Sequence, residues 1–119
     1  MNKRSKACQF DRKTAEAIVN RDQGCMFCNL HYHLENSLLA DRSVFDIMHI
    51  VNKSHGGLGV IQNGAQGCRY HHSLMDDGNK GFHEEMLQMA KNYLISIYPE
   101  WTEESVTYNK NKDLFIYRK

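Results

Sequence analysis

The spacing of the cysteines constrains this chain more than any other feature of its sequence. Cys25 and Cys28 form a C-x-x-C pair, and about forty residues later Cys68 and His71 form a C-x-x-H pair. A tight C-x-x-C turn directs two thiolates at one point, which is half of a tetrahedral zinc site, and the second pair supplies the other half. The spacing therefore predicts a structural zinc ion held by Cys25, Cys28, Cys68 and His71.

Other interpretations of these residues are weaker. Disulfides are a poor explanation because the start of the chain has charge but no apolar stretch, so we expect a cytoplasmic protein with reduced thiols. A redox dithiol would need a βαβ pattern that is missing around the C-x-x-C pair. His31 and His33 are competing ligand candidates, and Cys8 has no partner, so we expect it in a loose N-terminus.

Length and charge bound the class of protein. A chain of 119 residues and 13.9 kDa indicates one domain, residues 1–119, whose core is too small to dispense with a metal. No apolar run approaches the roughly 18 residues of a membrane span, which excludes a membrane protein. Residues 1–72 carry nine Lys and Arg against six Asp and Glu, although the net charge of the chain is only +1. This asymmetry permits a side that faces nucleic acid, and it begins with Lys3, Arg4, Lys6, Arg12 and Lys13.

Two helices are predicted from periodicity and caps. Asp11 can cap a helix over residues 11–22, with Gly24 just beyond its end. A stripe of Met and aromatic residues predicts a second helix over residues 82–98, which Pro99 closes.

The rest of the chain is predicted in shorter pieces. Residues 44–51 are rich in strand formers, and the glycines of residues 52–67 predict an irregular loop. For residues 29–42 the sequence does not decide between a short helix and a loop. The runs 106–108 and 114–117 predict a small terminal hairpin.

Histidines crowd between the two halves of the predicted zinc site. Four of the seven lie between His49 and His72, in the order strand, His49, glycine-rich loop, Asn63 and Cys68-x-x-His71-His72. If zinc fixes Cys68 and His71, a short helix starts there and His72 points to its other side. His49 can then face His72 across a small cleft.

In these residues the chain resembles the HNH nucleases, over roughly residues 25–78. The resemblance implies an α+β protein with a ββα-metal core, stabilised by zinc and flanked by the N-terminal and C-terminal helices. Small stand-alone domains of this kind are similar to those of phages and mobile elements, which would place the protein in a host cytoplasm. His71 stands where the family usually has a cysteine, a replacement that zinc accepts. The motifs are Met48-His49-Ile50-Val51, Ser54-His55-Gly56-Gly57, Asn63 and Cys68-Arg69-Tyr70-His71-His72.

The resemblance implies hydrolysis of DNA phosphodiester bonds. His49 would be the general base, and His72 would hold a divalent ion, Mg²⁺, Mn²⁺ or Ni²⁺, on the scissile phosphate. Asn63 would fix the loop and thereby the direction of His49. Arg69 and His55 are possible phosphate contacts, although single residues of these types usually face water.

One position departs from the family. The residue before the base is often an acidic or histidine metal ligand, and here it is Met48, which cannot bind a hard ion. Asp46 and Asp76 are the candidate replacements. Strand alternation puts Asp46 on the face opposite His49 unless the strand is bulged. Asp76 lies one helical turn after His72, so we favour Asp76 and keep Asp46.

A second hypothesis is a non-catalytic zinc module that binds nucleic acid or protein, its catalytic metal site spoiled by Met48. In that case His49 is a packed strand residue, and both Asn63-Gly64 and Asp76-Asp77-Gly78 are ordinary turns. A nuclease needs a second, weakly held ion besides zinc, and a binding module needs zinc alone. The sequence leaves the DNA target, the mode of cutting and the oligomeric state open.

Overall fold

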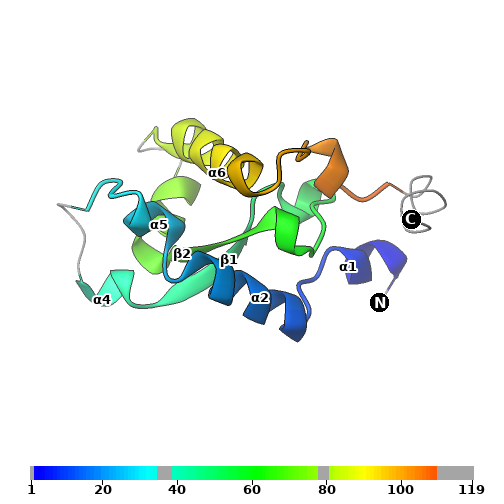
Figure 1. Cartoon of the computed structure of the whole chain (residues 1–119), viewed down its shortest axis with the longest axis horizontal. Coiled ribbons are helices and arrows are strands. Elements are labelled where there is room, and N and C mark those ends of the chain that lie inside the picture. The colour runs from blue at the N-terminus through cyan, green and yellow to red at the C-terminus, as the bar shows by residue number, and fades with distance from the viewer. Residues whose placement is uncertain (1, 35–38, 78–80, 110–119) are drawn as a thin grey trace.

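Two antiparallel strands lie at the centre of the chain, and helices from both of its ends pack around them (Figure 1). The computed structural model describes residues 2–34, 39–77 and 81–109. Strand β1 (Phe45–His49) pairs with β2 (Gly64–Cys68) in a regular register, from Phe45 opposite Cys68 to His49 opposite Gly64. The predicted α+β class and the strand within residues 44–51 are confirmed.

Both long helices form where the caps and periodicity place them. Helix α2 (Arg12–Asp22) starts after Asp11, whose carboxylate accepts a 2.7 Å hydrogen bond from the Thr14 N–H. It ends at Gln23, which takes a left-handed conformation with φ of 51°. Helix α6 (His83–Ile97) turns an apolar face, with Met86, Ala90 and Leu94, fully into the core. Cap residues and the periodicity of one apolar stripe were sufficient to predict both helices, because these features are local to each helix.

Short helices connect these elements. The N-terminus is not loose as expected: Asn2 caps a helix there, and Cys8 follows it with only 1% of its surface exposed. Residues 29–42, for which both a short helix and a loop were considered, end in a short helix. The short α-helices are α1 (Lys3–Ala7), α3 (Met26–Asn29), α4 (Leu39–Arg42) and α5 (Arg69–Asp76), and the 3₁₀ helices are η1 (Lys53–His55), η2 (Ile61–Asn63) and η4 (Glu104–Val106).

The glycine-rich segment contains a strand, so the prediction of an irregular loop up to residue 67 is wrong at its end. Strand β2 is buried at every position. A Cβ on Gly64 would lie 2.3 Å from the Ile18 Cδ1, and one on Gly67 would lie 2.7 Å from the Met48 Cε. Close packing on both neighbours therefore requires glycine, and it outweighs the weak strand propensity of this residue.

The first run of the predicted terminal hairpin, residues 106–108, contacts the glycine-rich loop. Val106 belongs to η4, and its carbonyl accepts a 2.8 Å hydrogen bond from the Leu58 N–H of the glycine-rich loop. Thr107 forms an isolated antiparallel bridge with Gly57. The second predicted run, residues 114–117, lies outside the described residues.

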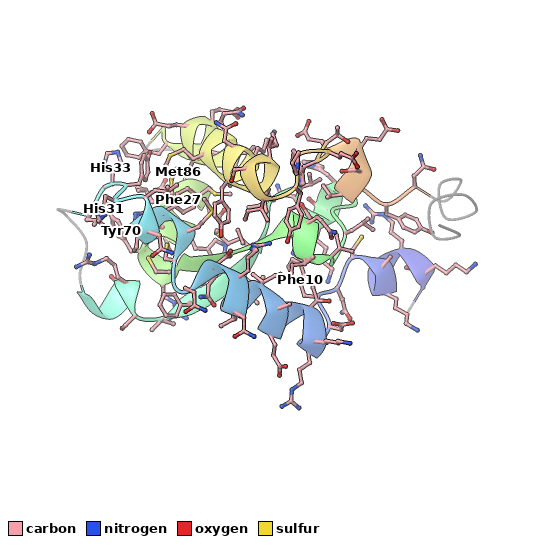
Figure 2. The ribbon with its side chains drawn as sticks, viewed as in Figure 1. Phe10, Phe27, His31, His33, Tyr70 and Met86 are labelled. Carbon is pink, nitrogen blue, oxygen red and sulfur yellow. The ribbon has the colours of Figure 1, made fainter. Side chains whose placement is uncertain are left out.

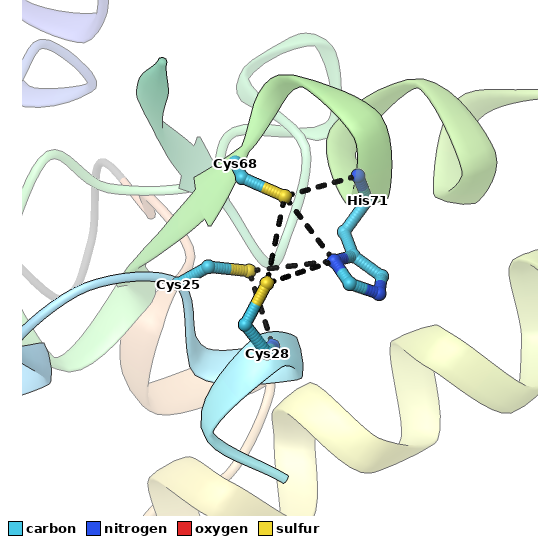
Figure 3. A group of neighbouring side chains, drawn as sticks. All are labelled: Cys25, Cys28, Cys68 and His71. Carbon is cyan, nitrogen blue, oxygen red and sulfur yellow. Dashed lines mark hydrogen bonds between the residues drawn. The ribbon is translucent and has the colours of Figure 1, made fainter. Parts of the chain in front are cut away.

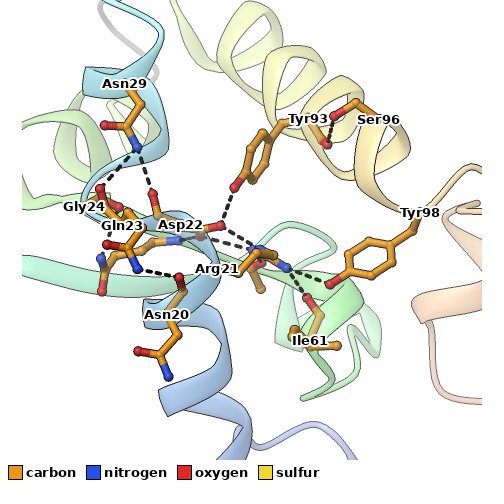
Figure 4. A network of polar contacts seen from close by, with 12 residues as sticks. Asn20, Arg21, Asp22, Gln23, Gly24, Asn29, Ile61, Tyr93, Ser96 and Tyr98 are labelled. Atoms are coloured by element: carbon orange, nitrogen blue, oxygen red, sulfur yellow. Dashed lines mark hydrogen bonds and ion pairs between the residues drawn. The ribbon is translucent and has the colours of Figure 1, made fainter.

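A buried polar network joins α2 to β2 and α6 (Figure 4). The carboxylate of Asp22 accepts hydrogen bonds from the Gln66 N–H at 2.7 Å, from the neighbouring Arg21 guanidinium at 2.6 Å and from the Tyr93 hydroxyl. Burial, together with the bond to Asp22, raises the pKa of Tyr93 to about 12. Each hydrogen bond that the buried Asp22 carboxylate accepts offsets part of the free-energy cost of removing its charge from water. Because the donors come from α2, β2 and α6, the network fixes how these three elements pack.

In the described part of the chain, none of the helices has the length and apolar character required to cross a membrane.

Candidate functional site

The four predicted zinc ligands come together in the interior (Figure 3). One ligand atom from each of Cys25, Cys28, Cys68 and His71 lies within 4.8 Å of all the others. Cys25 and Cys28 come from the start of α3, and Cys68 and His71 come from the junction of β2 with α5. The structure thus joins two halves separated by about forty residues into one group that can hold a metal ion.

The spacing of these atoms matches tetrahedral zinc. His71 Nδ1 lies 3.6, 3.5 and 3.2 Å from the Sγ atoms of Cys25, Cys28 and Cys68, and the last two Sγ atoms are 3.8 Å apart. Bonds of about 2.3 Å to sulfur and about 2.0 Å to nitrogen imply edges of about 3.8 Å between sulfurs and about 3.5 Å between sulfur and nitrogen. The donor set and its distances therefore fit a zinc ion.

Local helix geometry explains why the x-x spacing works. Cys25 and Cys68 each occupy the cap position of a helix, and their Sγ atoms accept hydrogen bonds from the N–H groups of Cys28 and His71 at 3.4 and 3.5 Å. A cap residue and the third helical residue lie side by side, so both side chains reach one point. The same turn is used twice, once at α3 and once at α5.

The electrostatics of the cluster favour a bound cation. Burial raises the pKa of the Cys25 thiol, but hydrogen bonds from His71 and from the Cys68 and Cys28 backbones outweigh it and lower the pKa to about 6. Burial and the adjacent Cys25 charge raise the pKa of Cys28 to about 12. The raised pKa of Cys28 reflects repulsion between adjacent thiolates, which a bound metal ion would remove.

A strained turn orients the histidine of the cluster. The fully buried His71 donates from Nε2 to the Tyr32 carbonyl at 2.5 Å, which leaves Nδ1 as the metal-binding atom. The residues on either side, His31 and His33, have left-handed φ angles of 56° and 46°. Neither belongs to the converging group of donors. Instead of competing as ligands, they build the turn that presents the Tyr32 carbonyl.

His72 lies on the other side of α5, between two carboxylates. Its Nδ1 is 3.0 Å from Asp46 Oδ2 and its Nε2 is 3.2 Å from Asp76 Oδ2. The side chains of His72, Asp46 and Asp76 are 35, 38 and 64% exposed, so water and solutes reach all three. The sequence treated the carboxylates as alternatives, and the structure brings both to the same imidazole.

This arrangement offers donors to a cation. Each ring nitrogen of His72 has a carboxylate oxygen beside it, and imidazole nitrogens and carboxylate oxygens are both metal ligands. The two carboxylates approach opposite ring atoms, and among the described residues the converging group of three or more donors is the one around Cys25. His72 can therefore share an ion with Asp46 or with Asp76, as a pair of donors. The separations of 3.0 and 3.2 Å are close to the roughly 3 Å between neighbouring ligands of a six-coordinate ion.

His49, the last residue of β1, is held by the N-terminal segment. Its Nε2 lies 2.7 Å from the Cys8 carbonyl oxygen, and its ring packs against Phe10 with centroids 4.2 Å apart. A carbonyl only accepts, so Nε2 carries the proton and Nδ1 keeps a lone pair. Burial lowers the pKa of His49, the bond to Cys8 opposes this, and the charge of Lys53 lowers it further. The lowered pKa favours the neutral imidazole, which can accept a proton at Nδ1.

His49 and His72 are each placed by a different part of the chain. Among the described residues no hydrogen bond or ring contact joins them, and β1 is regular, so Asp46 and His49 point to opposite faces. The contact of His49 with Cys8 and Phe10 escaped the sequence analysis. No local pattern signals it, since His49 and Cys8 are 41 positions apart.

Asn63 closes the loop that follows His49. Its side chain is fully buried, accepts from the Val51 N–H at 2.8 Å, and donates to the carbonyls of Val51 and Leu58 at 3.1 and 3.0 Å. An amide carries one carbonyl acceptor and an NH₂ group with two donors, so all three bonds can be made by this one side chain.

The Arg21 guanidinium supports Asn63 from outside. It donates to the carbonyls of Ile61 and Gly64, at 2.8 and 2.6 Å, on either side of Asn63 in the chain. Burial opposes the charge of Arg21, but its bonds to Asp22 and Tyr98 outweigh burial and raise its pKa. This support was also missed, because a lone arginine within a helix carries no recognisable pattern.

The remaining predicted contacts lie at the surface. Arg69 and His55 both have exposed side chains, the first at the start of α5 and the second at the end of η1. Met48 is buried and points into the core beside Gly67.

No family model, curated protein or solved structure matches the chain.

Proposed function

We propose that the chain is a metal-dependent endonuclease of the HNH type that hydrolyses DNA phosphodiester bonds. One observation carries the proposal: Cys25 and Cys28 join Cys68 and His71 in a cluster that fits zinc, and residues 45–76 also fix two further histidines in different surroundings. The Nε2 of His49 is held by the Cys8 carbonyl and the pKa of this imidazole is lowered, and His72 is bracketed by carboxylates. The order β1, β2, α5 supports the ββα core that the resemblance implies.

In this proposal the protein residues act as follows. Nδ1 of His49 takes the proton of the attacking water, while the Cys8 carbonyl holds the opposite ring nitrogen and so fixes the direction of the lone pair. Asn63 keeps the chain beyond β1 in place, because a base displaced by about 1 Å costs roughly 10²-fold in rate. His72 with Asp46 or Asp76 would hold a divalent ion. When bound, that ion stabilises negative charge on the phosphate and on the leaving oxygen.

Zinc in the cluster would supply folding energy and take no part in the reaction. Three cysteines and a histidine fill all four positions of a tetrahedral ion, which leaves none for water or substrate. Free thiols of this kind suit a reducing cytosol, which is where we place the protein.

A second function is favoured by one observation. Met48 is buried where the family has a metal ligand, and His72 offers an ion one carboxylate on each side instead of a convergent set. A zinc-stabilised module that binds nucleic acid without cutting it would have these properties. The two functions differ in whether a second, weakly held ion is needed.

A plasmid assay tests the proposal. Supercoiled DNA is incubated with zinc-loaded protein and Mg²⁺, Mn²⁺ or Ni²⁺, and nicked and linear products are counted. His49→Gln keeps a donor for the Cys8 carbonyl but removes the base, so we expect a loss of about 10²- to 10⁴-fold with unchanged folding. The matched control is His31→Asn, since His31 is exposed and Asn tolerates its left-handed backbone.

Full activity of His49→Gln would remove His49 as the base. Absence of cleavage by the unchanged protein with every metal, together with a clear mobility shift of the same DNA, would establish the binding module instead.

A further inference from the structure

Helix α1 is attached to the glycine-rich loop next to His49. The Arg4 guanidinium donates to the Ser54 carbonyl at 3.2 Å, and the Gly59 N–H donates to the Ala7 carbonyl at 2.9 Å. A Cβ on Gly59 would lie 2.0 Å from the Gln9 carbonyl oxygen, so glycine is needed for the two backbones to touch. Figure 1 shows α1 at the same end of the molecule as the segment that follows α6.

The following residues complete this attachment. The Cys8 carbonyl accepts a 2.7 Å hydrogen bond from His49 Nε2. Phe10 lies against the His49 ring and close to Gly64. Figure 2 shows Phe10 near the middle of the molecule, away from His31 and His33 at one end. Residues 2–10 thus form a fixed wall of the His49 site.

This wall is positively charged and has no acidic side chain of its own. Lys3, Arg4 and Lys6 all lie on α1 with exposed side chains, and residues 2–10 contain neither Asp nor Glu. Lys3 and Lys6 are neighbours one turn apart. The loop beside α1 has the same character, because the chain carries no Asp or Glu between Asp46 and Asp76.

The loop adds a further cation. Lys53 of η1 is exposed, and it is near enough to His49 to lower the pKa of that imidazole. Acidic residues on the other side of the loop belong to η4 and its flank, where Glu103 pairs with Lys91 at 2.7 Å. The cations of α1 and of η1 therefore lie on the two segments that are joined by the Arg4 bond to Ser54.

We propose that α1 and η1 form the surface that contacts the sugar-phosphate backbone of duplex DNA beside His49. The inference rests on the proposed function for the choice of DNA, and it names the part of the chain that holds this substrate. A row of exposed cations without an apolar face suits phosphates, whereas a membrane or a protein groove would also require apolar side chains. The hydrogen bond from Arg4 to the Ser54 carbonyl fixes the position of α1 relative to the loop that carries η1.

The test is binding of fluorescent duplex DNA at several salt concentrations. The protein is zinc-loaded, and no other divalent ion is added, so cleavage does not interfere. The double variant Lys3→Gln/Lys6→Gln loses two phosphate contacts. We expect the slope of log K against log salt to fall by about two, since each contact contributes about 0.9, and the affinity to fall at every salt concentration.

Two controls make the result specific. Lys3→Arg/Lys6→Arg keeps both charges and should bind as the unchanged protein does. Lys91→Gln removes one charge from α6, where Lys91 is paired with Glu103, and should leave the slope unaltered. Thermal unfolding of the two Lys3/Lys6 double variants should coincide with that of the unchanged protein, because Lys3 and Lys6 are exposed.

An unchanged slope in the double variant would overturn the inference and leave the proposed nuclease standing. Failure of the unchanged protein to bind duplex DNA at low salt, or tighter binding of single-stranded RNA, would also overturn it. A reduced slope in a protein that never cleaves plasmid would support the surface and refute the nuclease.

Discussion

His71 and His72 are neighbours in sequence but occupy opposite chemical settings on the two sides of α5. His71 is fully buried, and its Nδ1 meets three sulfur atoms at 3.2 to 3.6 Å. His72 is one-third exposed and meets a carboxylate on each ring nitrogen. One helix therefore presents a closed, soft donor set on its inner side and an open, hard donor set on its outer side.

In the proposed nuclease, this difference would separate stability from reactivity. Thiolates and a buried imidazole satisfy a zinc ion completely, so the inner side can contribute folding energy without exposing a reactive position. Carboxylates at the surface suit Mg²⁺ or Mn²⁺, which exchange ligands with water and with phosphate. Changes on the inner side should therefore affect folding, and changes on the outer side should affect activity.

The largest expected effect comes from the inner side. Cys68→Ser removes a ligand of the zinc cluster and should abolish folding at room temperature, because zinc binding worth about 10–16 kcal/mol exceeds the stability of a small domain. The measurement is metal content together with thermal unfolding. Cys8→Ser is the matched control: Cys8 is equally buried but lies outside the cluster, so its loss should cost only about 1–3 kcal/mol.

A Cys68→Ser protein that lacks zinc and still melts at the parental temperature would contradict the structural role of the cluster. Equal destabilisation by Cys8→Ser and Cys68→Ser would show that burial of the thiol, not the metal, matters at both positions.

A smaller effect is expected on the outer side. Asp46→Asn and Asp76→Asn each keep an oxygen that accepts from His72 but remove a charge. We expect plasmid cleavage to fall by about 10- to 100-fold for Asp46→Asn and by less for Asp76→Asn. Asp46 is the more buried of the two and is held by a strand, so its carboxylate loses less freedom on binding an ion. Folding should be unchanged in both variants.

The two aspartates serve as controls for each other. A greater loss for Asp76→Asn would identify the Nε2 side of His72 as the metal side. Unaltered activity in both variants would show that neither carboxylate beside His72 is needed for cleavage, and it would contradict the assignment of the outer side of α5 to activity.

The smallest effect concerns the pH dependence set by Lys53. Burial and Lys53 lower the pKa of His49, so cleavage should rise with pH through a midpoint below that of free imidazole, about 6.5. Lys53→Gln removes one lowering charge and should move the midpoint upward, whereas Lys53→Arg should not. The same sign holds for folding: stability linked to neutral His49 is present above pH 6.5 and is lost as the pH falls through the lowered pKa.

Rate profiles of the three proteins at one metal concentration measure this shift. A midpoint that moves downward in Lys53→Gln would contradict the placement of Lys53 beside His49. Identical shifts in Lys53→Gln and Lys53→Arg would point to packing, not charge, as the cause.

Local patterns predicted much of this molecule. Asp11 marked the start of α2, Pro99 lay just after α6, and the two x-x spacings identified the four residues that the structure brings together. Each of these features depends on one turn of backbone, or on one helical face, and a sequence displays such relations directly.

Other features needed contacts between distant segments. The burial of Cys8 and the helix before it, the strand made from glycines 64 and 67, and the polar network of Arg21 with Asp22 all escaped local patterns. From the sequence alone, glycines predict a loop; only the folded structure shows that a neighbouring side chain occupies the space where a Cβ would lie. A charged pair likewise predicts an exposed position, and only the packing of three elements shows that it is buried.

The sequence by itself determined which residues can share a zinc ion, because cap geometry within a single turn makes a C-x-x-C or C-x-x-H pair converge wherever it folds. Only the tertiary structure decided that Cys8 holds His49 and that both Asp46 and Asp76 reach His72. Cys8 and His49 meet across 41 positions, and Asp46 and His72 across 26. Pairings of that range depend on how strands and helices pack, since no local preference of the backbone encodes them.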